Sequence, residues 1–231
     1  MNHRPARFSA VGVGDTDANL SNGIRGADAL KQVSEHIPGY SYGTAEVAPS
    51  SVSMRGLEDL KISAGFTEED EHYLRLAGEV LADQTKQIVD HWRSGIIARI
   101  PHLAKHSRTP EGNASPEYLA GSNLRFQQWI LDTCQRLYDQ DWLNYQQEIA
   151  RRHTAVKKNQ TDGVRSTPQV PLQDAIAFVA VMNETITPYL AAKGNSAEEV
   201  DKMHRAWCKS IQLQLALWVG PYLEAGKSAN D

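Results

Sequence analysis

The sequence predicts an all-α fold, and three observations carry the prediction. Apolar residues recur at intervals of three and four over most of the chain after residue 66, which is the spacing of one face of an α-helix. Helix start and stop signals bound these stretches. No stretch of useful length alternates apolar and polar residues as a half-buried β-strand does. We expect about seven or eight helices and no internal repeat.

The composition is that of one substantial globular domain. The chain has 231 residues, 41% of them hydrophobic, and a formal net charge of −4. No run of about 18 apolar residues could span a bilayer, and the mild negative charge gives no general attraction to nucleic acid. Two cysteines are too few for a disulfide framework. The start of the chain lacks the apolar core of a signal peptide, so we expect a cytoplasmic protein.

The chain divides into a tail, a domain and a short end. Residues 1–36 lack periodicity and are rich in small polar residues, so we expect a disordered N-terminal tail. The segment IPGYSYG, residues 37–43, is too apolar for a linker and is expected to pack on the domain as a compact turn. A short helix is expected from Leu57 to Ser63. The domain is expected to cover residues 37–225, and residues 226–231 form a C-terminal tail.

The first long helical pattern begins at Thr67. Thr67 and Asp70 form an N-terminal cap with acidic residues in the first turn, where the helix dipole favours them. We expect this helical pattern to continue through Trp92. After a turn around Pro101, Ser115-Pro116-Glu117 is a second start signal. The face of that helix is formed by Tyr118, Leu119, Ser122, Phe126, Trp129, Ile130 and Thr133.

Three further helices are expected. One runs from about Asp139 to Val156. The next follows a loop over residues 167–171 and continues to Lys193, with a kink at Pro188. Gly194 then ends that helix, and Ser196 with Glu199 makes a capping box for the last one. The last helix is apolar on two sides, so it is either central in the core or covered by a partner chain.

One histidine lies on the inward stripe of the Asp139–Val156 helix. Trp142, Tyr145, Ile149, His153 and Val156 recur at intervals of three or four, so His153 shares the apolar face. From the residues alone, a core histidine with a hydrogen-bonded ring is the favoured interpretation. A zinc site would need three or four converging ligands. Haem needs one axial imidazole, because the porphyrin supplies the other four nitrogens.

Other motifs are weaker. His102 and His106 have the i, i+4 spacing of two ligands on one helix face, but we expect both on the solvated surface because no third ligand is near. No CxxCH motif is present, which excludes covalent haem attachment. Glycine-rich phosphate loops and GxSxG elbows are also absent from the sequence, so nucleotide and hydrolase chemistry have no support.

Eight segments, in consistent order between residues 37 and 225, resemble the protoglobins, single-domain globins related to the sensing domain of globin-coupled sensors. The segments are IPGYSYG (37–43), AGEVLADQ (77–84), the region of Trp92, RFQQWILDT (125–133), YDQDWLNYQQEIARRH (138–153), KKNQTDGV (157–164), KGNSAEEVDKMHRAWCKS (193–210) and LQLALWVGPY (213–222).

The resemblance implies a globin fold, a 3-over-3 helical sandwich, with an extra N-terminal helix and a b-type haem. His153 matches the family's iron ligand, although Thr154 replaces the second histidine of the family's RHH segment. The resemblance places Trp92 and Phe126 on the distal side of the haem, Phe178 on the G helix lining the pocket, and Arg125 near the propionates. The other cofactor-binding residues that we expect are Arg93, Ser122, Tyr145 and Ile149. Lys157 and Lys158 are expected in a solvated turn, with haem propionates as the alternative partner.

The distal side departs from the family. A tyrosine follows the distal tryptophan in protoglobins, whereas Arg93 and Ser94 follow Trp92 here. The Ile97–Pro101 region is also one residue longer. Either an arginine has taken the role of the tyrosine, or the register shifts and the pocket is apolar. An arginine is mostly exposed in proteins, so the outward orientation of Arg93 is the favoured expectation.

The resemblance implies a protein that binds the diatomic gases O₂, CO and NO at His-ligated iron, as a gas binder or sensor. It also implies a homodimer through the last two long helices, with no nucleic acid or membrane partner. The alternatives are a haem enzyme that acts on NO, nitrite or peroxide, and a haem-free helical interaction module.

Overall fold

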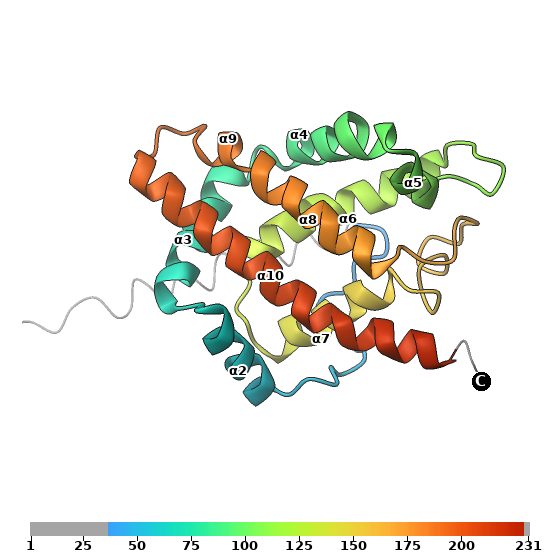
Figure 1. Ribbon diagram of the computed structural model, residues 1–231, viewed down its shortest axis with the longest axis horizontal. Helices are drawn as coiled ribbons and strands as arrows, with labels where there is room; N and C mark the ends of the chain where they lie inside the picture. Colours follow the sequence, from blue (N-terminus) through green and yellow to red (C-terminus); the bar gives the residue numbers. More distant parts are fainter. Residues whose placement is uncertain (1–36, 229–231) are drawn as a thin grey trace, which may run out of the picture. The chain divides into compact units, whose positions relative to one another are not determined.

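The protein's structure is a computed structural model that describes residues 37–228. The tail predicted for residues 1–36 lies outside them. The described part of the chain is helical (Figure 1), and its one β-type contact is an isolated bridge between Arg108 and Ala114. The all-α prediction is therefore confirmed.

The first described helix, α2 (Met54–Ala64), is longer than the Leu57–Ser63 expected from sequence. Ser53 caps its start by accepting a hydrogen bond from the Gly56 amide at 3.1 Å. Gly65 ends it in the left-handed region, with φ of 59°, a conformation that glycine adopts without a side-chain clash.

The pattern expected to run from Thr67 through Trp92 is interrupted. Thr67 and Asp70 do form the predicted capping box of α3 (Glu68–Leu81), but α4 (Thr85–Asp90) begins only after a turn. The side-chain amide of Gln84 fills this break by donating to the Val80 and Tyr189 carbonyls, at 2.8 and 3.1 Å. The prediction of one helical stretch from Thr67 through Trp92 was therefore wrong.

A π-helix, η1 (His91–Ile96), follows α4. Each π-helical turn holds more residues than an α-helical one, so this element rotates the side chains after Asp90 away from their α-helical positions. Two 3₁₀ turns, η2 (Ile97–Arg99) and η3 (Lys105–Ser107), and the single turn α5 (Pro101–Ala104) complete the region.

The long helix α6 (Pro116–Gln135) starts at the predicted Ser115-Pro116 signal. It packs against α3 and α4. At the α3 contact, a Cβ on Gly78 would lie 2.7 Å from the Gln135 side chain and 3.0 Å from Cys134. The close approach of the two helices therefore needs a glycine at position 78.

The second half of the described chain holds α7 (Gln140–Arg151), α8 (Leu172–Thr185), α9 (Thr187–Leu190) and α10 (Ala197–Ser228). The helix expected to reach Lys193 breaks at Ile186, two residues before Pro188, as a kink there predicts. The Ser196–Glu199 capping box is present: the Ser196 amide donates to Glu199 Oε2 at 2.8 Å, and the Glu199 amide donates to Ser196 Oγ at 3.2 Å. Since α10 ends at Ser228, the helix continues into the range expected as a tail.

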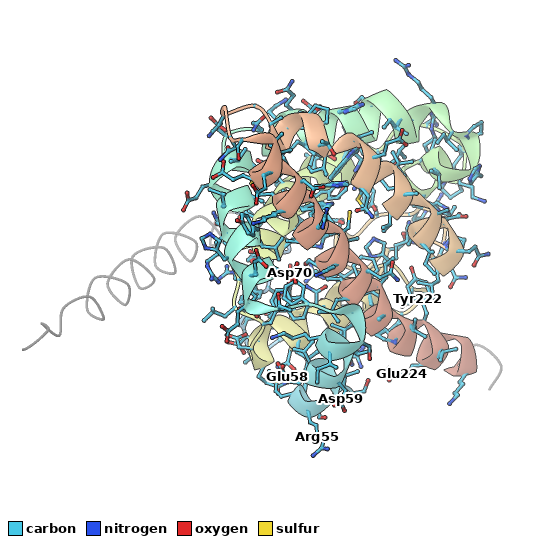
Figure 2. All side chains as sticks on the ribbon, turned by 60° about the vertical axis from the view of Figure 1, so that its left-hand side comes forward. Arg55, Glu58, Asp59, Asp70, Tyr222 and Glu224 are labelled. Atoms are coloured by element: carbon cyan, nitrogen blue, oxygen red, sulfur yellow. The ribbon has the colours of Figure 1, made fainter. Side chains whose placement is uncertain are left out.

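Figure 1 shows α10 crossing the described domain with α8 beside it, and α10 contacts α3, α7 and α8. Its two-sided apolarity follows from this central position, because Leu213 and Leu217 are buried within the chain itself. An ion pair ties α10 to α3: Lys209 lies 2.8 Å from Asp70, which is labelled in Figure 2.

Candidate functional site

The described domain contains a cavity of about 250 Å³ between α6, α7, α8, α10 and the π-helix. Eight of the nine residues expected to bind a cofactor border it, namely Arg93, Ser122, Arg125, Phe126, Tyr145, Ile149, His153 and Phe178. These residues come from the π-helix, α6, α7, the turn after α7 and α8, so distant parts of the chain converge on one space, as a ligand pocket requires.

His153 faces this cavity from just beyond the end of α7. The helix ends at Arg151, earlier than the expected Val156, which is 49% exposed rather than inward. His153 is nevertheless held in place, because its Nδ1 lies 2.8 Å from the Ile149 carbonyl and its ring stacks on Trp218 at 5.1 Å. As the carbonyl can only accept, Nδ1 carries the proton and Nε2 keeps a free lone pair.

Burial lowers the pKa of His153 to about 4, because the charged imidazolium loses its hydration inside the protein. The ring is therefore neutral at physiological pH. A neutral imidazole with one nitrogen fixed by a carbonyl is the state in which histidine ligates a metal.

A polar network supports the helix end next to His153. Glu148 is buried and accepts hydrogen bonds from Arg152 at 2.7 Å and Lys157 at 2.6 Å. Arg152 also donates to Ser41 Oγ at 2.8 Å and to the Gly39 carbonyl. The turn at residues 38–43 therefore packs on the domain, as the sequence predicts. We call Tyr145, Ile149, His153 and Trp218 the histidine wall.

A second group, which we call the arginine wall, consists of Arg93, Ser122, Phe126 and Trp129. The guanidinium of Arg93 lies over the Phe126 ring, 5.3 Å from its centroid. Its Nη2 is 3.5 Å from Ser122 Oγ, the outer limit for a hydrogen bond, and its Nε has no hydrogen-bond partner. The expectation that Arg93 points outward was wrong, because the π-helix turns it into the cavity.

Trp92 is the expected site residue that does not line the cavity. It is fully buried, its Nε1 donates to Thr185 Oγ1 at 2.8 Å, and its ring packs against Phe126 at 5.3 Å. Trp92 therefore backs the arginine wall through Phe126 instead of bordering the space directly.

Arg125 closes one edge of the cavity. It forms a two-oxygen ion pair with Asp162, at 2.9 and 2.7 Å, and donates to the Pro38 carbonyl at 2.6 Å. A Cβ on Gly39 would lie 2.9 Å from Arg125 Nη1, and the residue has φ of +72°. Only glycine allows this close approach in that conformation.

Two residues expected in solvent, His106 and Lys158, border the cavity instead. His106, expected on the surface, is 8% exposed, and its Nδ1 lies 2.7 Å from Thr167 Oγ1, whereas His102 is exposed as expected. Lys158, expected in a solvated turn, is 3% exposed and donates to the Thr167 carbonyl at 2.9 Å. Burial lowers the pKa of Lys158 to about 8. No local sequence signal marks either residue, because both depend on the loop at Thr167.

The apolar cavity, the fixed imidazole of His153 on its wall and the all-helical frame define a globin-type protein. Comparisons with known proteins agree. The sequence profile of the protoglobin family matches residues 53–228. The chain therefore belongs to the protoglobin family.

A solved structure shows the same fold. The globin domain of a globin-coupled sensor from Geobacter sulfurreducens superposes with a TM-score of 0.53 at 16% identity, covering 71% of this chain and 96% of that domain. No curated protein sequence matches the chain. None of the helices between residues 37 and 228 is long and apolar enough to cross a bilayer, and no cluster of three His, Cys, Asp or Glu side chains suited to a metal lies in that range.

Proposed function

We propose that the protein binds b-type haem in the cavity, with His153 Nε2 as the axial ligand, and that it binds O₂, CO or NO. The observation that carries the proposal is the state of His153, whose ring is neutral, fixed through Nδ1 and open to an apolar cavity through Nε2.

The residues that line the cavity fit haem. A porphyrin requires an apolar space with one axial nitrogen, and its two propionates require cations or hydrogen-bond donors at the rim. Arg125 and Lys158 border the same space as His153 and are the residues that we expect to hold the propionates. The Nε of Arg93 is a donor without an acceptor in the described part of the protein.

Haem, when bound, supplies four nitrogen ligands and an iron that takes a diatomic gas at its sixth position. The protein's own residues supply the rest. Ile149 holds the His153 proton on Nδ1, and Trp218 restricts rotation of the ring. Phe126, Phe178 and Trp129 line the cavity with aromatic surface, which excludes water from the gas site.

The experiment is an absorption spectrum of the purified protein, reconstituted with haemin where necessary, in ferric, ferrous and CO-bound states. We expect one haem per chain with the bands of a histidine-ligated globin. His153→Ala should weaken haem retention by about 10- to 100-fold or more, the range for loss of a metal-supporting group. His102→Ala, which removes an exposed histidine, is the matched control. A His153→Ala variant with the wild-type Soret band and CO affinity would disprove the assignment.

The same purified protein distinguishes two alternative functions from gas binding. A haem enzyme would turn over NO, nitrite or peroxide with a reductant, and Arg93, whose buried Nε has no hydrogen-bond partner, is the observation that favours anionic substrates. A haem-free interaction module would show no haem absorption after reconstitution.

We also propose a homodimer. Ile176 on α8 and Val219 and Leu223 on α10 are large apolar side chains that are 50, 40 and 63% exposed. They lie on the two long helices through which the resemblance implies pairing. The cytoplasmic location expected from the sequence stays a prediction.

A further inference from the structure

Arg93 differs from the other cavity arginines in having no acidic partner. Arg125 is paired with Asp162 and Arg152 with Glu148, both at 2.7 Å. Within residues 37–228, no carboxylate lies at ion-pair distance from Arg93, and its contacts are the neutral Ser122 hydroxyl at 3.5 Å and the Phe126 ring.

An arginine in this position stays charged and incompletely hydrogen-bonded. Burial lowers its pKa, and neighbouring Arg125 lowers it further, yet a guanidinium remains protonated at physiological pH. A buried cation without a partner is unfavourable unless an anion or water joins it. The side chain is thus a donor prepared for a negative group inside the cavity.

We infer that Arg93 is a binding group for small anions in the cavity, so that the haem site takes azide, nitrite or cyanide in preference to neutral ligands of similar size. The inference rests on the proposed haem function. A guanidinium presents planar paired donors that match such anions. Arg93 belongs to the arginine wall, which shares no element with His153 or its Ile149 and Trp218 contacts, so it is positioned for the ligand rather than for the axial histidine.

The haem propionates are the other source of negative charge. Arg125 lies beside Gly39, and Lys158 lies beside Thr167 and Tyr118, whereas Arg93 lies over the Phe126 ring. The three cations are close enough to interact, so haem retention and ligand choice must be measured separately. If Arg93 served a propionate, its removal would loosen haem. If it serves the sixth ligand, its removal would change ligand choice and leave haem retention intact.

The test compares azide and imidazole binding to the ferric haem protein by optical titration. We expect Arg93→Met to weaken azide binding by about tenfold or more, the change produced by losing one charge-assisted hydrogen bond. Imidazole affinity and the rate of haem loss to apomyoglobin should change by less than about threefold. Arg93→Lys, which keeps the charge, should recover part of the azide affinity. Arg99→Met removes an exposed arginine near the same segment and should match the wild type.

A second readout needs no haem. If the guanidinium is unpartnered, Arg93→Met should raise the thermal midpoint of the apoprotein, because it replaces a buried charge with an apolar chain of similar length. A lower midpoint would show that Arg93 stabilises the fold as it stands and would overturn the inference.

Three titration results would also overturn it: unchanged azide affinity, equal weakening of azide and imidazole, or faster haem loss with an unchanged azide-to-imidazole ratio. The last result would assign Arg93 to a propionate. The proposed function would instead be disproved if the wild type bound no haem or if His153→Ala retained haem as the wild type does. Failure of the inference about Arg93 and failure of the proposed function are therefore distinguishable.

Discussion

The histidine wall and the arginine wall border one cavity but are built in different ways. The histidine wall stands on a regular α-helix whose end is held by a buried carboxylate with two cationic partners. The arginine wall is backed by a π-helix, and the Nε of its buried cation has no partner. One wall is satisfied within the protein, and the other has an unused donor.

The difference separates positioning from selection. A ligating histidine must be held in one orientation, which the Ile149 carbonyl and Trp218 ring accomplish. A ligand-selecting group must instead keep bonding capacity for a molecule that comes and goes. Unsatisfied buried groups and π-helical turns both occur at functional sites in proteins, and here they coincide at Arg93.

The largest effect should come from breaking the support of His153. Trp218 is 8% exposed and Trp129, in the arginine wall, is 9% exposed. Either one replaced by Ala should lower the free energy of unfolding by about 3–5 kcal/mol, as measured by urea denaturation. Only Trp218→Ala removes the ring that stacks on His153, so it should release haem faster than Trp129→Ala does. Equal haem-loss rates would show that the stack does not hold the ligand.

Replacing an arginine should change the free energy of unfolding in opposite directions at the two walls: Arg152 supports the helix end beside the histidine wall, and Arg93 belongs to the arginine wall. Arg152→Leu leaves the buried Glu148 with Lys157 alone and frees the Gly39 carbonyl, and should lower the free energy of unfolding by about 2 kcal/mol. Arg93→Met should raise apoprotein stability. Arg151→Leu, which removes a partly exposed ion pair with Glu224 at 3.7 Å, is the control and should change stability by less than about 1 kcal/mol. An Arg152→Leu protein as stable as the wild type would show that the two walls do not differ in this way.

The fold was predictable wherever local chemistry decides it. The capping boxes at Thr67 and Ser196 and the proline in the first turn of α6 mark helix starts, because these signals depend on residues within one turn. The break at Gln84 was not predictable, since it uses the Tyr189 carbonyl from far along the chain. Periodicity also assumes 3.6 residues per turn, so it misplaced Arg93, which lies in a π-helix.

The candidate site was predictable by resemblance more than by pattern. The inward position of His153 followed from the stripe, although the helix itself ends before it. Lys158 was assigned to solvent because long charged side chains are mostly exposed, and His106 because no third metal ligand is near it in the sequence. Both are buried by contacts with Thr167, a tertiary arrangement that no window of sequence around either residue encodes.

The comparison extends to the outer face behind the histidine wall. Leu223→Lys combined with Val219→Lys on α10 should weaken self-association by about tenfold or more, because each places a charge in an apolar contact. The cavity faces of α10 should be unaffected, so haem binding should remain. Sedimentation should show about twice the 25.6 kDa chain mass for the wild type. A wild type that stays monomeric when concentrated would disprove the homodimer.

The smallest expected effect concerns Lys158, the cation between the two walls. Burial, and then the charge of Arg93, lower its pKa from 10.5 to about 8, while Asp162 raises it. The folded apoprotein therefore binds fewer protons at this site than the unfolded chain between about pH 8 and 10.5. Lys158 therefore contributes a rise in stability with pH in that window, whereas below it both states are charged and the destabilising contribution of the buried cation is fully present.

Tyrosines limit how far this rise can be followed. Burial raises the pKa values of Tyr40, Tyr42 and Tyr138, so their ionisation in the unfolded chain lowers stability as pH approaches 10. Burial also raises the pKa values of Cys134 and Cys208, so thiol ionisation in the unfolded chain opposes the effect of Lys158 in the same window. The contribution of Lys158 is therefore the difference between wild type and Lys158→Met in urea unfolding from about pH 7.5 to 9.5. Lys158→Met should flatten the slope of unfolding free energy against pH, and Lys105→Met, at an exposed lysine, should not. Bound haem should reduce the slope as well if a propionate pairs with Lys158, because the anion raises the lysine pKa. An apoprotein slope that is the same with and without Lys158 would show that its ammonium is hydrated and unsuited to a propionate.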